Sequence, residues 1–480
     1  MGLSRSLALM LAIAPITVIA QPAPAPKTPA PTAPKPAPKP KAASKLPAIE
    51  TFELANGLKV AVLANDAAPV VAVQVWYHAG SKDEPRNRRG SAHMFEHIMF
   101  KGTKFVRSEA HAQFLNGLGG VVNAQTDEDA THYINTVPAD YLDFAIRLEA
   151  DRMRNLVFRP DMIAGEREVV KEEIRQRENS PLQKGFLRFL AVAFTKHPYA
   201  WTSGGMLKDL DQTTPEDLKK FYDTYYRPNN ALLVVVGKTT AAAVKASAEK
   251  WFGPVAKGTA PPRPSEQAAE PAQTAKRREV VEPGQIGLTL VGYHVPPAKD
   301  KDIYALQVAA IILGAGESSR LKVRLKKSDA KTKKPFALDG GMEAFIREEP
   351  GIVIALGAFL DPAQADPVEA AILDEIAKLA ARGPTADELR KSKNQVQAGF
   401  LFSLENAQGL AQAIGRSWIL TGDATAFMRD IDEIEKITAT DVSRVVKKYM
   451  TADKATIVVI PPRGQAAPAP APAPAPGKGK

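Results

Sequence analysis

The chain has 480 residues, with 63 basic and 53 acidic side chains, a net charge of +10 and a pI near 9.4. Eight of the basic residues lie in the two terminal segments, which contain no Asp or Glu, so the body of the chain has 55 basic against 53 acidic residues. This near balance argues against nucleic-acid binding. Cysteine is absent, which excludes disulfides and a lipid-attachment cysteine.

Residues 1–20 have the pattern of a secretory signal peptide, with Arg5, an apolar run from Leu7 to Ala20, and small residues before Gln21. The run has 14 residues and contains Pro15, whereas a membrane span needs about 20. We therefore expect a cleaved leader, export to a periplasm and no membrane span in the mature chain; an uncleaved anchor is the less favoured alternative. Residues 21–45 alternate Pro and Ala with Lys, which predicts a disordered spacer.

The sequence His93-Met94-Phe95-Glu96-His97 is the strongest chemical signal. On a helix, positions i and i+4 share a face, so His93 and His97 can bind one metal ion with Glu96 beside them. The order H-x-x-E-H is the inverzincin pattern of zinc hydrolases. The competing interpretation is an exposed helix with two solvated histidines.

Two short strands and two long helices follow the histidine motif. A glycine pair precedes the strand that contains Asn123-Ala124-Gln125-Thr126, and a β-rich run over 131–137 follows, which predicts a hairpin. Helices are expected over 141–155 and 161–177.

The second of these helices is rich in Glu and can supply the third protein ligand that a catalytic zinc site needs. Its residues alone do not choose among Glu166, Glu172 and Glu173, and such a helix is often just a solvated face.

The body of the chain shows an internal duplication. Thr214-Pro215-Glu216-Asp217 begins a helix that leads to the apolar run 231–236, and Thr438-Ala439-Thr440-Asp441 leads to 455–460 at an offset of 224. Strands and helices are mixed in both halves, which indicates an α+β fold of two duplicated domains. We expect the domains at 46–257 and 276–463, a Pro-rich linker at 258–275, and a disordered Ala-Pro tail at 464–480.

The H-x-x-E-H motif, the Asn-Ala-x-Thr segment and the Glu-Arg-x-x-Val-x-x-Glu helix together resemble the pitrilysin/insulinase family of zinc metallopeptidases, especially its processing-peptidase branch. The resemblance spans nearly all of residues 46–462. It implies that each domain is a mostly antiparallel sheet packed with helices. In that family a Glu about 76 residues after the second motif His binds zinc, and residue 173 lies 76 positions after residue 97. The resemblance thus implies Glu173 as the third ligand and Glu166 as the supporting acidic residue.

The resemblance also implies a mechanism and a substrate. Zinc held by His93, His97 and Glu173, one ion per chain, would activate a water, and Glu96 would act as the general base. The segment Asn123-Ala124-Gln125-Thr126 would be the edge strand to which a short or unfolded peptide adds.

The second half lacks the metal motif, since Gln307, Ala310 and Ile311 stand where His93, Glu96 and His97 would be. In active family members the second domain usually supplies an Arg and a Tyr that stabilise the transition state, whereas here these positions align with Lys326 and Leu338, around a Lys-rich insertion at 327–334. Losing one such donor typically costs about 2.7–4 kcal/mol. Processing-type members of the family work as two chains, one of which carries zinc while the other completes the chamber. The resemblance therefore implies a heterodimer in which a related second subunit, itself without zinc, brings the Arg/Tyr pair.

Two alternatives remain open at this point. One is a homodimeric peptidase that uses Arg320 or Arg324 in place of the missing Arg. The other is a non-catalytic, zinc-stabilised envelope scaffold that binds peptides.

Overall fold

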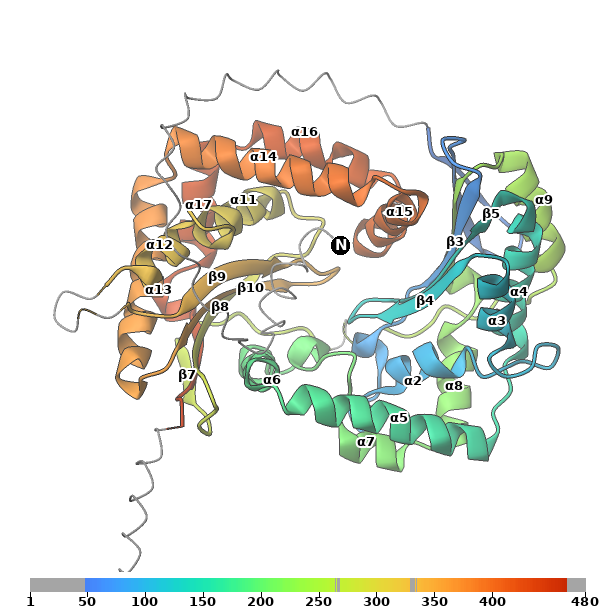
Figure 1. The fold of residues 1–480 in the computed structure, drawn as a ribbon, viewed down its shortest axis with the longest axis horizontal. Coiled ribbons are helices and arrows are strands. Elements are labelled where there is room, and N and C mark those ends of the chain that lie inside the picture. The colour runs from blue at the N-terminus through green and yellow to red at the C-terminus, as the bar shows by residue number, and fades with distance from the viewer. Residues whose placement is uncertain (1–47, 264, 266–267, 329–332, 334, 464–480) are drawn as a thin grey trace, which may run out of the picture.

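Two β-sheets, each covered by helices, organise the molecule (Figure 1). The computed structural model describes residues 48–263, 265, 268–328, 333 and 335–463. The predicted leader at 1–20, the spacer at 21–45, the tail at 464–480 and most of the Lys-rich insertion lie outside these residues. In the part of the chain that the structure describes, no helix combines the length and the apolar character needed to cross a membrane.

The first sheet has six strands in the order β1-β2-β6-β3-β5-β4. All neighbours are antiparallel except β2 and β6, which run parallel. The central strands β3 and β6 are almost continuously apolar and buried, as expected for strands covered on both faces. The strands are β1 Glu50–Glu53, β2 Lys59–Ala64, β3 Val70–Tyr77, β4 Val121–Thr126, β5 Thr131–Pro138 and β6 Ala231–Gly237.

The second sheet has five strands in the order β7-β11-β8-β10-β9, again with one parallel pair, β7 and β11. This order repeats β2-β6-β3-β5-β4 of the first sheet strand for strand, with β1 as the addition. The predicted α+β fold with two mostly antiparallel sheets is therefore confirmed, while the domain boundaries stay predictions. The strands are β7 Arg277–Val280, β8 Gly287–Val295, β9 Asp339–Phe345, β10 Gly351–Phe359 and β11 Thr456–Ile460.

The helices follow the same duplication. In the first half they are α2 Ser91–Ile98, α3 Ala110–Gly117, α4 Leu142–Asn155, α5 Pro160–Glu178, α6 Pro181–Ala193, α7 Leu207–Gln212, α8 Pro215–Tyr225 and α9 Ala241–Trp251. In the second half they are α11 Asp302–Gly314, α12 Arg320–Lys326, α13 Ala365–Arg382, α14 Ala386–Ser403, α15 Ala407–Thr421, α16 Asp430–Lys436 and α17 Ala439–Tyr449. The predicted helix starts at Thr214 and Thr438 are both capping boxes that close on an Asp at the third helical position.

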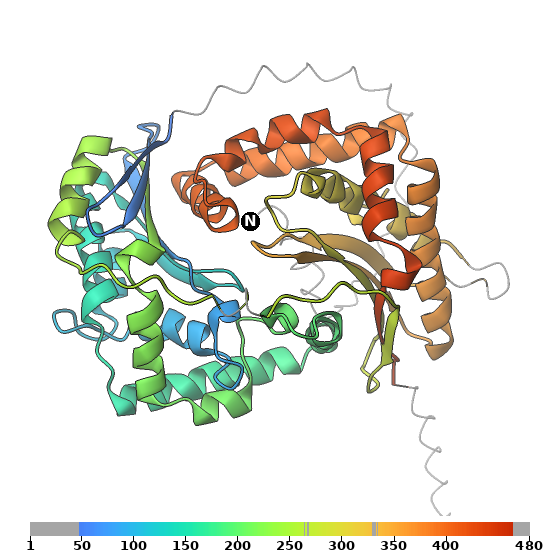
Figure 2. The ribbon, with the colours of Figure 1, turned by 180° about the vertical axis from the view of Figure 1, so that it is seen from behind.

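Each half lends one helix to the sheet of the other, as the views from both sides show (Figures 1 and 2). Helix α6 of the first half packs through Phe189 and Leu190 on β8, β10 and β11. Helix α15 of the second half packs through Leu410 and Ile414 on β2, β3 and β6. Because these contacts are apolar and buried, they hold the two halves together as one unit.

Both of these helices meet the opposite sheet at a glycine. A Cβ at Gly185 of α6 would lie 2.5 Å from Ile460 Cδ1, and a Cβ at Gly415 of α15 would lie 2.1 Å from the Trp76 indole. A side chain at either position would push the helix away from the sheet, so glycine permits the close approach.

A buried polar cluster joins the halves where the β4–β5 hairpin meets the β9–β10 hairpin. Lys82, which is almost fully buried, lies 3.0 Å from Asp129 of the first hairpin and is also paired with Glu348 of the second. The backbone N–H of Glu348 donates to Asp129 at 3.1 Å, and Arg347 is paired with Glu128. The tips of the two equivalent hairpins are thus fixed to each other by paired charges.

Candidate metal centre

The motif helix α2 presents two faces with different chemistry. Met94, Phe95 and Ile98 are buried in the core of the first half. His93 and His97 point to the other side, toward α5, with their ring centroids 5.0 Å apart. This division follows from the helical period, because residues three and four apart share a face.

Helix α5 brings a carboxylate to this histidine pair. One Glu173 oxygen lies 3.4 Å from His93 Nε2 and the other lies 3.7 Å from His97 Nε2. His93, His97 and Glu173 each offer a ligand atom, and these atoms all lie within 4.8 Å of one another. The ligand atoms of all three side chains therefore face one shared space between α2 and α5.

The donor set fits zinc. Two imidazole nitrogens and one carboxylate make the three-ligand set of a catalytic zinc site with an open fourth position. Burial, together with smaller effects of the neighbouring His97 and Arg177, lowers the pKa of His93 to about 3, which keeps the ring neutral and able to bind a metal. Its Nδ1 is buried and has no partner among the described residues.

The other predicted acidic residues occupy distinct places. Glu166 lies 3.4 Å from His97 Nδ1 and 2.9 Å from Lys101 Nζ, so it contacts a candidate ligand from outside the group. Burial alone would raise the pKa of Glu166, but hydrogen bonds with His97 and Lys101 outweigh it and lower the pKa. Glu172 instead points outward and lies 3.2 Å from Arg175.

Glu96 lies on α2 between the two histidines and is only half-buried. Burial raises its pKa above the ordinary value of Glu, against the smaller opposing effects of the Thr126 hydroxyl and His97. For His97, burial would lower the pKa, but the surrounding carboxylates outweigh burial and raise it, with the hydrogen bond to Glu166 as the largest of their effects. A carboxylate with a raised pKa beside the metal group is suited to accept a proton near neutral pH.

The predicted substrate segment, Asn123 to Thr126, lies on β4, which is the edge strand of the first sheet. Among the described strands, β4 pairs with β5 alone, so its other edge can offer backbone groups to a peptide. β4 also contacts α2, and Gln125 accepts a hydrogen bond from Gln412 of α15 at 3.2 Å. The edge strand therefore lies between the metal group and the second half.

Sequence reasoning missed the group that fixes the start of α2. The cap position, Gly90, has no side chain, and the buried Glu84 takes over its role by accepting hydrogen bonds from the N–H groups of Gly90 at 2.9 Å and Ala92 at 2.8 Å. Burial raises the pKa of Glu84 to about 8. No local pattern signals this cap, because its oxygen comes from outside the helix.

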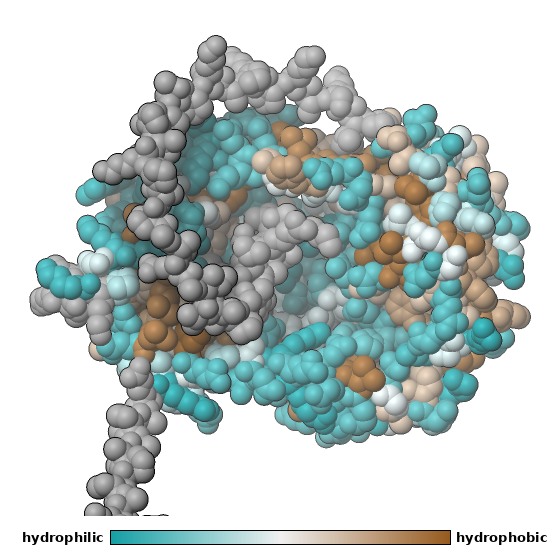
Figure 3. Space-filling view, in the orientation of Figure 1, coloured by the Kyte–Doolittle hydropathy of each residue, from teal (hydrophilic) through white to brown (hydrophobic). Residues whose placement is uncertain are grey.

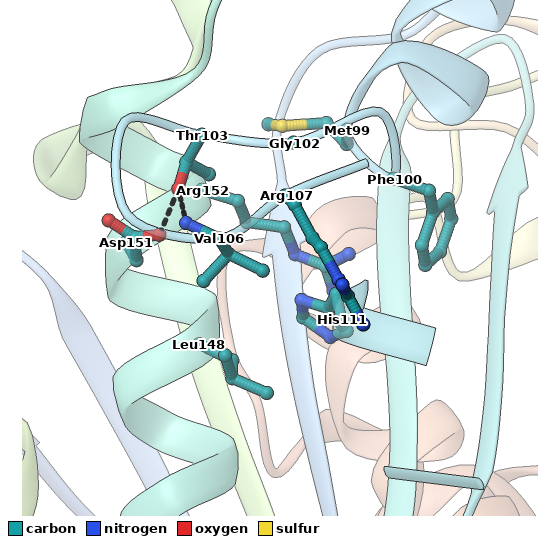
Figure 4. A pocket seen from close by; sticks show the side chains of 10 residues that line it. All are labelled: Met99, Phe100, Gly102, Thr103, Val106, Arg107, His111, Leu148, Asp151 and Arg152. Atoms are coloured by element: carbon teal, nitrogen blue, oxygen red, sulfur yellow. Dashed lines mark hydrogen bonds between the residues drawn. The ribbon is translucent and has the colours of Figure 1, made fainter. Parts of the chain in front are cut away.

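A small cavity lies next to the C-terminal end of α2, and the residues that line it belong to the scaffold that supports the motif helix (Figure 4). Arg152, in its wall, forms a buried ion pair with Glu149 and lies 4.2 Å from the centre of the Tyr133 ring. The Tyr133 hydroxyl in turn donates to the Phe95 carbonyl of α2 at 2.9 Å. The cavity contains none of the candidate metal ligands and belongs to the scaffold beneath them.

The second half has no equivalent site at the matching positions. Ala310 and Ile311 are buried in the mostly apolar helix α11, and Gln307 is half-buried. Lys326 is paired with Glu317 at 2.9 Å, and about half of the Leu338 side chain is exposed.

Comparison with known proteins agrees with this geometry. Residues 59–202 match the family described as Insulinase (Peptidase family M16), and residues 212–396 match the Peptidase M16 inactive domain. The zinc protease PqqE of Helicobacter pylori is 31% identical over 425 residues, which cover 88% of this chain and 94% of that protein. The chain belongs to peptidase family M16. It is a zinc protease of this family, as the H-x-x-E-H motif predicts.

Other M16 relatives extend the comparison. A probable mitochondrial-processing peptidase subunit beta of Arabidopsis thaliana is 26% identical, covering 87% of this chain and 79% of that protein. A crystal structure of a protease from Helicobacter pylori superposes with a TM-score of 0.81 at 30% identity, covering 87% of this chain and all of that one. An M16 structure from Pseudomonas fluorescens, at 20% identity and a TM-score of 0.77 over 87% of this chain and 98% of that one, shares the fold.

Proposed function

We propose that this chain is the zinc-bearing subunit of a two-chain endopeptidase that cleaves short or unfolded peptides. The observation that carries the proposal is the convergence of His93, His97 and Glu173 within 4.8 Å. These three side chains would hold one zinc ion, which when bound acidifies a water and polarises the scissile carbonyl.

The residues around the metal group have separate tasks in this proposal. Glu96 accepts the proton of the attacking water and delivers it to the leaving amine, a role that its raised pKa supports. Glu166 holds His97 through Nδ1 and thereby fixes the orientation of the ring. Asn123, Ala124, Gln125 and Thr126 pair with the backbone of an extended substrate, which explains acceptance of many sequences.

The need for a second subunit is supported by the cations of the second half. Lys326 is paired with Glu317. Arg320 forms two 2.7 Å hydrogen bonds with Glu388, and Arg324 lies 4.2 Å from the centre of the Phe336 ring. Because these side chains are already engaged, a homodimer that uses Arg320 or Arg324 would first have to break existing contacts. A related chain with an Arg/Tyr pair is the simpler partner.

The predicted leader supports export to a periplasm, and the duplicated sheets support domains at 46–257 and 276–463 joined by the segment 258–275.

Replacement of Glu96 by Gln tests the proposal. The Glu96→Gln variant should keep zinc and lose about 10²–10⁴-fold in the rate of hydrolysis of an unstructured fluorogenic peptide. Glu172→Gln is the matched control, since this carboxylate points away from the metal group. Each protein is assayed alone and with related chains recovered by pull-down from the native envelope. Unchanged cleavage by Glu96→Gln would refute the mechanism, and zinc binding without cleavage by any wild-type pair would favour the scaffold.

A further inference from the structure

Arg177 lies one helical turn after Glu173 on α5, and its guanidinium contacts the candidate ligand. Arg177 Nη2 lies 3.4 Å from Glu173 Oε2. The same oxygen, Glu173 Oε2, lies 3.4 Å from His93 Nε2. Arg177 therefore holds the carboxylate oxygen that faces the first histidine.

The guanidinium is itself confined on its other side. A Cβ at Gly204 would lie 2.9 Å from Arg177 Nη1, so the loop before α7 approaches the guanidinium closely and does so at a residue without a side chain. The side chains of Arg177 and Glu173 are 41% and 38% exposed, so each keeps some rotational freedom. The contact with Glu173 restricts that freedom before any metal arrives.

Each of the two α5 carboxylates near the histidines has its own cation. Glu166 lies 2.9 Å from Lys101, and Glu173 lies 3.4 Å from Arg177. Glu96, the carboxylate without such a partner among the described ion pairs, is the one that must exchange a proton. This arrangement separates the carboxylates that hold position from the one that reacts.

We propose that Arg177 is a positioning residue, which orients the Glu173 carboxylate toward His93 and His97 so that the metal group is formed in advance. The inference rests on the proposed function, because it assumes that Glu173 binds zinc. Groups that orient a metal ligand typically contribute 10–100-fold to metal affinity. If Arg177 acted only through its charge, it would weaken zinc binding, since a cation repels a nearby divalent ion.

The chain offers a matched control on the same helix. Arg175 is 45% exposed and lies 3.2 Å from Glu172, a carboxylate outside the metal group. We would compare wild type, Arg177→Ala, Arg177→Lys and Arg175→Ala as full chains. The zinc dissociation constant is measured by competition with a chromogenic chelator, and kcat and KM are measured at saturating zinc with the subunit pair.

The expected result is a 10–100-fold weaker zinc affinity for Arg177→Ala, with partial recovery in Arg177→Lys and no change in Arg175→Ala. KM at saturating zinc should stay at the wild-type value. Equal or tighter zinc binding by Arg177→Ala would overturn the inference in favour of simple repulsion. A raised KM with unchanged zinc affinity would overturn it in favour of substrate recognition by Arg177. Failure of the wild-type chain to bind zinc would instead refute the proposed function itself.

Discussion

Helices α2 and α11 take equivalent places in the two halves, yet they differ in what they expose. α2 packs on α5, α8 and β4, and α11 packs on the corresponding α14, α17 and β9. α2 keeps one polar face with His93, Glu96 and His97, whereas α11 is mostly apolar and buried and has only the half-buried Gln307 at the matching position. The same scaffold thus accommodates a reactive helix and a purely structural one, so the activity depends on a few side chains and not on the fold.

The first way to test this contrast is to remove the chemistry from each half in turn. His93→Ala should abolish zinc binding and, with it, peptide hydrolysis, because two protein ligands remain where three are needed. Gln307→Ala, at the matching position of α11, should change neither. Metal content by elemental analysis and cleavage of a fluorogenic peptide decide the question; stoichiometric zinc in His93→Ala would contradict the assignment.

The second test concerns what the halves share, the exchanged helices. Phe189→Ala in α6 should lower the free energy of unfolding by about 3–5 kcal/mol, and Ile414→Ala in α15 by about 2–5 kcal/mol, since both side chains are fully buried. Because each helix covers the sheet of the other half, both variants should still unfold in one transition. Urea unfolding followed by far-ultraviolet circular dichroism would reveal two separated transitions if the halves were independent.

The third test compares the residue that caps α2 in the first half with the residue that caps α17 in the second half. Above pH 8, where Glu84 is ionised, Glu84→Gln places an amide NH₂ against one of the two N–H groups at the start of α2, which should cost about 1–3 kcal/mol and weaken zinc binding. Thr438→Ala removes the cap of α17 and should cost about 0.5–2 kcal/mol. Zinc affinity should be unchanged in Thr438→Ala. An equal effect of both variants on zinc affinity would show that Glu84 acts on stability alone.

The smallest effect is expected at the hairpin tips that join the halves. Burial would raise the pKa of Glu348, but hydrogen bonding and charge from His78 and Lys82 lower it. Its stabilising contribution is therefore complete above the ordinary Glu pKa of about 4.3 and is lost as the pH falls through the lowered value. Glu348→Gln should lose less stability than wild type on acidification. Thermal unfolding at a series of pH values would show parallel curves if the ion pairs contribute nothing.

Local spacing predicted much of this structure. The i, i+4 spacing of His93 and His97 indicated the motif helix. The recurrence of one helix–strand pattern, at Thr214 and again at Thr438, indicated the duplication, because each copy of the pattern is formed by residues near each other in the chain. Helical periodicity also explains why Glu166 and Glu173, seven residues apart, share a face while Glu172 points to solvent. The outward face of α5 is correspondingly hydrophilic in Figure 3.

Contacts between distant segments could not be predicted in this way. The choice of Glu173 over Glu166 and Glu172 came from family resemblance and not from the residues themselves. The contact of Arg177 with Glu173 could have been predicted, since the two residues are four apart on one helix. The cap by Glu84 could not, because Glu84 lies outside the helix that it caps. An apolar helix face does not specify which sheet it covers, so the exchange of α6 and α15 depends on tertiary packing that no periodicity encodes.

The exchange of α6 and α15 also determines how the molecule responds to a cut in its backbone. Thr259 and Ala260, at the start of the proposed linker 258–275, are exposed and therefore accessible to proteases. Cleavage there would break one peptide bond and leave both apolar surfaces covered, so the fragments should migrate together on a native gel and separate only in denaturant. Each half therefore depends on the other to cover its sheet, even after the backbone between them has been cut.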